Sequence, residues 1–123
     1  MEINDATAAF SALSQGTRLS AFRLLVQAGP EGAPAGTLSE ALGIPHNTLS
    51  FHLAHLSRAG LVSSRRAGRS IIYLANFPFV QELVRYMAEN CCSAEFASVR
   101  DDQRRRIAVI ELAGCCKPRE HPS

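Results

Sequence analysis

The chain of 123 residues lacks the features that mark membrane, secreted and most catalytic proteins. No apolar run approaches the roughly 18 residues of a transmembrane helix, and no basic segment followed by an apolar one opens the chain. Glycine-rich phosphate loops, G-x-S-x-G and H-E-x-x-H are also absent. We therefore expect a single small domain, without a membrane partner or enzymatic activity, whose size suits a binding module that completes its core by dimerising.

Lysine is nearly absent as well, since Lys117 is the only lysine among 13 basic residues. The arginines concentrate in residues 15–70, where six of them accompany two glutamates. Residues 1–14 are acidic and residues 71–123 are balanced. Arginine makes forked contacts with phosphates and guanine, so this distribution favours a nucleic-acid partner, with an ordinary solvated surface as the alternative.

The chain has four cysteines in two adjacent pairs, at positions 91–92 and 115–116. Neither pair has the C-x-x-C spacing of a structural zinc ribbon. A disulfide between neighbouring residues would close a strained ring, and no export signal is visible. We therefore expect reduced thiols in a cytoplasmic protein.

Apolar periodicity predicts a mainly helical chain. The predicted helices span residues 4–13, 17–28, 38–42, 47–59 and 77–90, with a further short helix over 104–113. Phe10 is assigned to the apolar stripe of the first helix and Leu19 to that of the second, where Arg18 and Arg23 face away from the stripe. A loop rich in glycine and proline, residues 29–36, separates the second helix from the third.

Capping and turn residues set the expected ends of these helices. Asn4 or Asp5 is expected to cap the first helix, and Thr37 with Glu40 forms a possible capping box for the third. Gly43 is expected to end the third helix.

A hairpin is predicted directly after the helix over 47–59. Strand-like runs at 61–64 and 70–74 flank a tip that carries Arg65, Arg66 and Arg69. Two short helices joined by a glycine turn and followed by a basic hairpin have the order of a winged helix-turn-helix. The predicted fold class is therefore mainly α with a small β-hairpin wing.

The helix over 47–59 carries the expected DNA-reading face. Leu49, Leu53 and Leu56 form its core side, which leaves a small, mostly polar face opposite them. Such a face can enter a major groove, where Asn bonds adenine and Phe touches a thymine methyl. His52 lies at the border of the apolar stripe. For this residue, a half-buried ring that is hydrogen-bonded to a neighbouring backbone group is an equal alternative to DNA contact. The expected DNA-contacting residues are Asn47, Thr48, Ser50, Phe51, His52, His55, Arg65, Arg66 and Arg69.

The stretch from Asn47 to Val62, with the following Arg66-Ala67-Gly68-Arg69 and Tyr73, resembles the ArsR/SmtB family of bacterial winged-helix metalloregulators. The resemblance extends over about residues 6–90. It implies a homodimer paired through the first and fifth helices, and a repressor that leaves double-stranded operator DNA when its inducer binds. It also implies DNA contacts by Ser50 and His52 in the recognition helix and by Arg66 and Arg69 in the wing. On this basis residues 1–90 form the DNA-binding and dimerisation domain, and residues 91–123 a cysteine-bearing tail.

The chain departs from the family at the inducer site. Many arsenic sensors of the family carry C-x-C in the helix before the recognition helix, but residues 38–43 contain no cysteine. Zinc sensors place Asp and His on the fifth helix, and residues 77–90 contain neither. The resemblance therefore points to a branch with a thiolate site at the end of the fifth helix. The expected ligands are Cys91, Cys92, Cys115 and Cys116, three of which would suffice.

Trivalent arsenic suits such a site, because it is a soft, three-coordinate centre that prefers thiolates. Arsenite is therefore the expected inducer, with no organic cofactor. Three alternatives stay open: a redox-sensing repressor that forms disulfides, a sensor of antimony, cadmium or an organoarsenical, and a purely structural dimerisation module.

Overall fold

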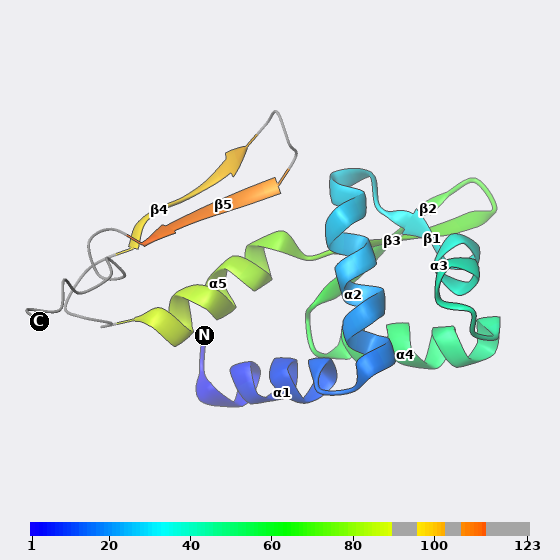
Figure 1. Ribbon diagram of the computed structural model, residues 1–123, viewed down its shortest axis with the longest axis horizontal. Coiled ribbons are helices and arrows are strands. Elements are labelled where there is room, and N and C mark those ends of the chain that lie inside the picture. The colour runs from blue at the N-terminus through cyan, green and yellow to red at the C-terminus, as the bar shows by residue number, and fades with distance from the viewer. Residues whose placement is uncertain (90–95, 103–106, 113–123) are drawn as a thin grey trace, which may run out of the picture.

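The computed structural model describes residues 1–89, 96–102 and 107–112, with side chains described through residue 89. The helices are α1 (Ile3–Leu13), α2 (Gly16–Ala28), α3 (Ala35–Leu42), α4 (His46–Arg58) and α5 (Phe77–Ala88), with a 3-10 turn, η1, at Gly29–Glu31. The strands are β1 (Ala33–Pro34), β2 (Val62–Ala67), β3 (Ser70–Ala75), β4 (Phe96–Asp102) and β5 (Ile107–Leu112). Figure 1 shows α2, α3, α4 and the β2–β3 hairpin gathered at one end, with α5 extending towards the other.

The core lies where α1, α2, α3 and α4 meet. Leu49, Leu53 and Leu56 of α4 are completely buried, which confirms the predicted apolar stripe. The other large side chains that are fully buried are Leu25, Leu38 and Leu61. Because all three leucines of α4 point into this core, the opposite face of α4 is left for solvent or a partner.

A three-stranded antiparallel sheet with the order β1–β3–β2 forms the wing. The predicted hairpin is confirmed and is longer than expected, while β1 lies in the segment predicted as loop, where two residues pair with β3. Gly32 permits this pairing because it has a φ of 66° and stands against β3. A Cβ atom there would collide with the carbonyl oxygen of Tyr73 and the side chains of Ile72 and Leu74.

The turn between α3 and α4 is built as predicted. Gly43 ends α3 in the left-handed region with a φ of 67°. The Ser39 hydroxyl donates a hydrogen bond of 2.6 Å to the carbonyl of Ile44, which closes the turn onto α3. These bonds set the direction in which α4 leaves the turn.

The predicted caps of α1 and α3 are wrong. Glu2 caps α1, and its backbone N–H donates to Asp5 Oδ2 over 3.1 Å, so Asp5 acts from inside the first turn. The third helix begins at Ala35 after Pro34, which places Thr37 inside it. Pro34 has the extended backbone conformation of an N-cap residue, so α3 begins directly after it and Thr37 does not act as the cap.

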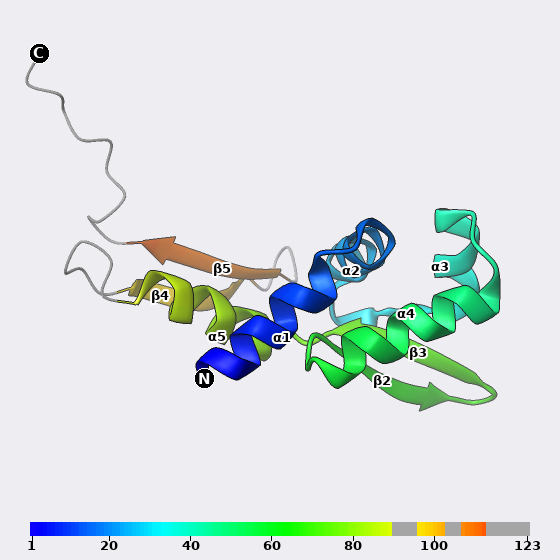
Figure 2. The ribbon, with the colours of Figure 1, turned by 90° about the horizontal axis from the view of Figure 1, so that it is seen from below.

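The predicted helix over 104–113 is wrong, because the described part of that segment is a strand. Residues 107–112 form β5, which pairs antiparallel with β4, and both strands lie beside α5 (Figures 1 and 2). The run of Ile107, Val109 and Ile110 explains the difference, because β-branched residues favour strands. Within the described residues, no helix is long and apolar enough to cross a membrane.

Two outer apolar residues assigned to the helix stripes are also exposed. Phe10 of α1 and Leu19 of α2 both face solvent in the single chain. On α5, Leu83 is buried, but Met87 is 56% exposed. The face formed by α1 and α5 thus keeps much of its apolar surface uncovered.

Candidate nucleic-acid interface

The second helix of the helix-turn-helix, α4, presents an exposed face opposite its buried leucines. Asn47, Thr48, Ser50 and Phe51 are all exposed, and Phe51 leaves 63% of its surface accessible. An aromatic side chain so exposed on a polar face contributes little to the core. The face therefore combines hydrogen-bonding groups with one apolar contact, as direct reading of base edges requires.

The β2–β3 hairpin contacts α4 through β2, and Figure 2 shows the two next to each other. Arg65 and Arg66 lie in β2, paired with Ile72 and Ile71 of β3, while Arg69 belongs to the two-residue turn between the strands. Successive residues of a strand point to opposite faces, so Arg65 and Arg66 diverge. The predicted basic tip thus consists of one arginine in the turn and two on the strand leading to it.

The three arginines of the wing have different surroundings. Arg65 donates a hydrogen bond of 3.1 Å from Nη2 to the carbonyl oxygen of Glu31 in η1, which ties its side chain back to the protein. Arg66 and Arg69 are exposed at the far end of the hairpin. These two are better placed than Arg65 to reach a phosphate.

A hollow of about 330 Å³ separates the start of α4 from the wing. Its wall includes Ser50 and Arg69 from the predicted contact residues, together with His46 and Tyr73. The sequence did not single out His46 as a contact residue, although it directly follows Pro45 and precedes Asn47. The hollow joins the recognition helix and the wing into one surface that carries hydroxyl, imidazole and guanidinium groups.

His52 is half-buried, and its hydrogen-bond partner is the side chain of Arg18 and not the backbone group that one of the two alternatives for this residue expected. Arg18 Nη1 lies 3.4 Å from His52 Nδ1, and Arg18 Nε donates to the carbonyl of Ala12 over 2.7 Å. The expectation that Arg18 faces away from the apolar stripe of its helix is therefore wrong, because Arg18 is half-buried and its guanidinium lies between the helices. The His52 ring also stands edge-on to Phe51, with ring centres 5.8 Å apart.

His55 is half-buried one turn further along α4. Desolvation lowers the pKa of His55, and the positive charges of Arg18, Arg58 and His52 lower it further. At neutral pH the ring is consequently an uncharged hydrogen-bonding group. It resembles the polar residues of the reading face more closely than the cationic arginines of the wing.

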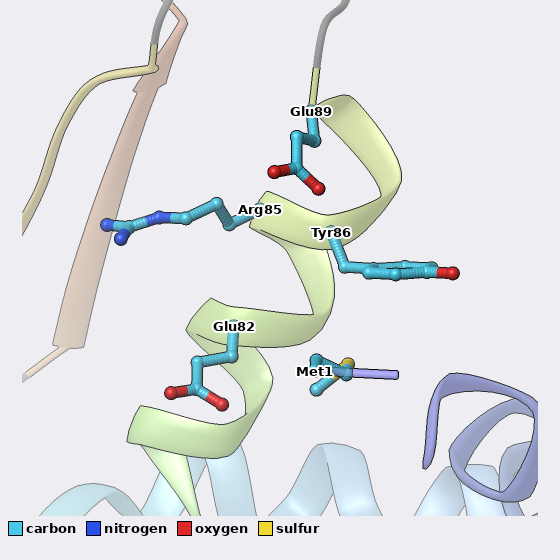
Figure 3. Close-up of a pocket in the computed structure, with 5 residues that line it drawn as sticks. All are labelled: Met1, Glu82, Arg85, Tyr86 and Glu89. Carbon is cyan, nitrogen blue, oxygen red and sulfur yellow. The ribbon is translucent and has the colours of Figure 1, made fainter. Parts of the chain in front are cut away.

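A second surface lies on α1 and α5. Ile3 and Phe10 of α1 are exposed, Ile3 by 68%, and Met1 before α1 and Met87 of α5 are exposed as well. A hollow of about 250 Å³ is lined by Met1 and residues of α5. Figure 3 shows Tyr86 leaving α5 on the side where Met1 lies and Arg85 leaving it on the opposite side. Large apolar side chains gathered in this way favour a protein partner.

The predicted metal ligands Cys91, Cys92, Cys115 and Cys116 lie outside the described residues. In the part of the chain with described side chains, no three His, Cys, Asp or Glu residues converge as metal ligands would. Since α5 ends at Ala88, the first cysteine pair follows closely in the sequence. The arsenic site stays a prediction.

The helix-turn-helix, the exposed polar face of α4 and the basic wing define a DNA-binding winged helix-turn-helix protein. Residues 13–65 match the family described as "Helix-turn-helix domain". No curated protein matches the sequence.

Similar solved structures identify the family more specifically than this domain match does. The transcriptional repressor BigR from Xylella fastidiosa is 30% identical, with a TM-score of 0.55, over 73% of this chain and 89% of that one. An ArsR-like transcriptional regulator from Rhodococcus sp. RHA1 is 28% identical, with a TM-score of 0.61, over 68% of this chain and 76% of that one. A homodimeric winged helix-turn-helix DNA-binding domain from Mycobacterium bovis, a possible ArsR-family regulator, is 27% identical, with a TM-score of 0.59, over 72% and 82%.

The chain belongs to the ArsR family of winged helix-turn-helix transcriptional regulators. Its fold and family are those of DNA-binding regulators and not of enzymes.

Proposed function

We propose that this regulator is a homodimeric repressor that binds double-stranded operator DNA and leaves it when trivalent arsenic binds its cysteine thiolates. One observation carries the DNA half of the proposal. The exposed face of α4 lies beside two exposed wing arginines, Arg66 and Arg69, so one surface offers base-reading and phosphate-binding groups together. Side chains of α4 would read base edges in the major groove, and the wing would bind neighbouring phosphates.

The α1–α5 face supports the dimer. Its exposed apolar residues, Met1, Ile3, Phe10 and Met87, would be covered by the same face of a second chain. The similar domain from Mycobacterium bovis is homodimeric. In a symmetric dimer each α4 would read one half-site of a palindrome, with the half-sites about 34 Å apart.

The arsenic half of the proposal rests on the chemistry of the cysteines. Helix α5 ends at Ala88, and two adjacent thiols, Cys91 and Cys92, follow after Glu89 and Asn90. A second pair could supply the third sulfur that As(III) requires. A site joined to the end of α5 would act on the dimer surface itself. Binding there could change the separation of the two recognition helices and so favour release from DNA.

The test is fluorescence anisotropy of the reduced protein on the DNA upstream of its own gene while arsenite is added. We expect release at about one arsenite per subunit. Cys91→Ser and Cys92→Ser should retain the affinity of the arsenic-free protein for DNA and lose the response, whereas Ser93→Ala should behave as the unmodified chain. Loss of DNA binding by the cysteine variants before arsenite is added would contradict the separation of the two sites.

A mild oxidant distinguishes the alternative of redox sensing. If the protein–DNA complex survives arsenite but dissociates on oxidation, the signal is disulfide formation and not arsenic binding. Titrations with antimonite, cadmium and an organoarsenical, with the thiols consumed per metal counted, would show whether another thiophilic species is preferred.

A further inference from the structure

Arg18 occupies the point where three helices meet, and neither the wing nor the recognition face includes it. It lies in the first turn of α2, half-buried, and its backbone N–H donates to Gln15 Oε1 over 2.8 Å. The helices α1, α2 and α4 pack against one another around it. Ala9, Ala12 and Ala21 are fully buried there, and such small side chains allow the helices to approach closely.

The Arg18 guanidinium joins two of these helices. Nε donates to the carbonyl of Ala12 in the last turn of α1, where helix carbonyls have no partner within their own helix. Nη1 lies 3.4 Å from Nδ1 of His52 on the recognition helix. A planar fork with donors on separate nitrogens can serve both acceptors at once, which an ammonium group cannot do in the same geometry.

This contact determines where the proton of His52 resides. Arginine carries only donors, so His52 Nδ1 must accept with its lone pair. In a neutral imidazole the other nitrogen, Nε2, then carries the hydrogen. The ring is also positioned by Phe51, which stands edge-on to it and belongs to the exposed face of α4.

We propose that Arg18 is a positioning residue of the DNA interface, which holds His52 in the Nε2–H tautomer and ties the recognition helix to the end of α1. Base edges in the major groove present acceptors such as purine N7 and guanine O6, so a fixed Nε2–H donor can bond them and a ring with the proton on Nδ1 cannot. Because Arg18 bonds both helices, a shift of α1 would be transmitted to α4. Helix α1 is one of the two helices of the apolar α1–α5 face. The inference deepens the proposed function and rests on it for the contact with DNA.

The first experiment needs no variant and no DNA. Nitrogen-15 NMR of the histidine rings in the reduced full-length protein at neutral pH distinguishes Nδ1–H from Nε2–H tautomers. We expect His52 to be the Nε2–H form, and Arg18→Lys, which keeps the charge, to return the ring to a mixture. Arg23→Lys, an exposed arginine on the same helix, should leave the ring unchanged. A mixture or an Nδ1–H form in the unmodified protein would overturn the inference.

The second experiment uses the same variants on DNA. Arg18→Lys should weaken operator binding about tenfold, the size expected for a hydrogen bond from a charged group, while affinity for random DNA and thermal stability stay close to those of Arg23→Lys. Equal loss on random DNA would assign Arg18 to general electrostatics and overturn the positioning role.

Amide substitutions at His52 supply a further check. A glutamine amide nitrogen lies near the place of Nε2, and an asparagine nitrogen near that of Nδ1. His52→Gln should therefore bind operator DNA about tenfold better than His52→Asn. The reverse order would overturn the proposed donor. If the unmodified protein has the Nε2–H tautomer but binds no DNA, the proposed function fails while the tautomer assignment stands.

Discussion

The two helices α4 and α5 are similar in length and both amphipathic, yet their apolar faces differ in how far the single chain buries them. Three leucines of α4 are fully buried within one chain. On α5 only Leu83 is buried, and Met87 remains 56% exposed. The difference assigns them separate roles: α4 is anchored by its own domain and directs a polar face outwards, whereas α5 offers an apolar face that a second chain can cover.

The largest expected effect comes from breaking the anchor of α4. Leu53→Ala removes a completely buried side chain and should lower the free energy of unfolding by about 2–5 kcal/mol. Phe51→Ala, on the exposed face of the same helix, should change it by less than about 0.5 kcal/mol. Denaturant unfolding at a fixed protein concentration measures both. Similar losses for the two variants would contradict the assignment of the two faces.

The next effect tests the apolar face of α5. Met87→Glu places a charge on the surface assigned to the dimer and should weaken self-association at least about tenfold, because an unpaired carboxylate is costly to bury. Ile71→Glu adds the same charge at an exposed apolar position of the wing and should leave the dimer intact. Sedimentation equilibrium gives both constants. A Met87→Glu protein that dimerises normally would exclude this face.

A smaller effect is expected at the wing, where all three arginines are exposed and one of them, Arg65, is hydrogen-bonded to the carbonyl of Glu31. Replacing Arg66 and Arg69 by alanine should weaken specific and random DNA equally, and should reduce the slope of log affinity against log salt by about one for each phosphate that the wing no longer binds. Arg65→Ala should change the slope less, because its guanidinium bonds the carbonyl of Glu31. Weakening confined to the operator would mean that the wing reads sequence.

The same contrast explains which features the sequence could predict. The leucine stripe of α4, the glycine turn and the hairpin each follow from local periodicity or backbone preference, so the helix-turn-helix and the exposed face of α4 were predictable. Strand β1 was not predictable, because a strand of two residues has no periodic pattern. Its pairing with β3, far along the sequence, depends on the close approach of Gly32 to that strand. Arg18 was misassigned for a different reason: the predicted apolar stripe of α2 included Leu19, which is exposed. The buried residues of α2 are Ala21, Phe22 and Leu25, and their helical spacing from Arg18 places all of them on its own face of the helix.

The smallest expected effect concerns His55. Its pKa is lowered in the folded protein, first by desolvation and then by the charges of Arg18, Arg58 and His52. The unfolded chain therefore binds more protons than the folded chain as pH falls through the ordinary range of histidine, so acidification from about pH 8 to pH 5 should reduce stability. Replacing His55 by glutamine removes this contribution, and the fall in melting temperature should become smaller. His46→Gln is the matched control on the same helix. If His55→Gln lost as much stability on acidification as the unmodified chain, protonation of His55 would not be what destabilises the folded protein at low pH.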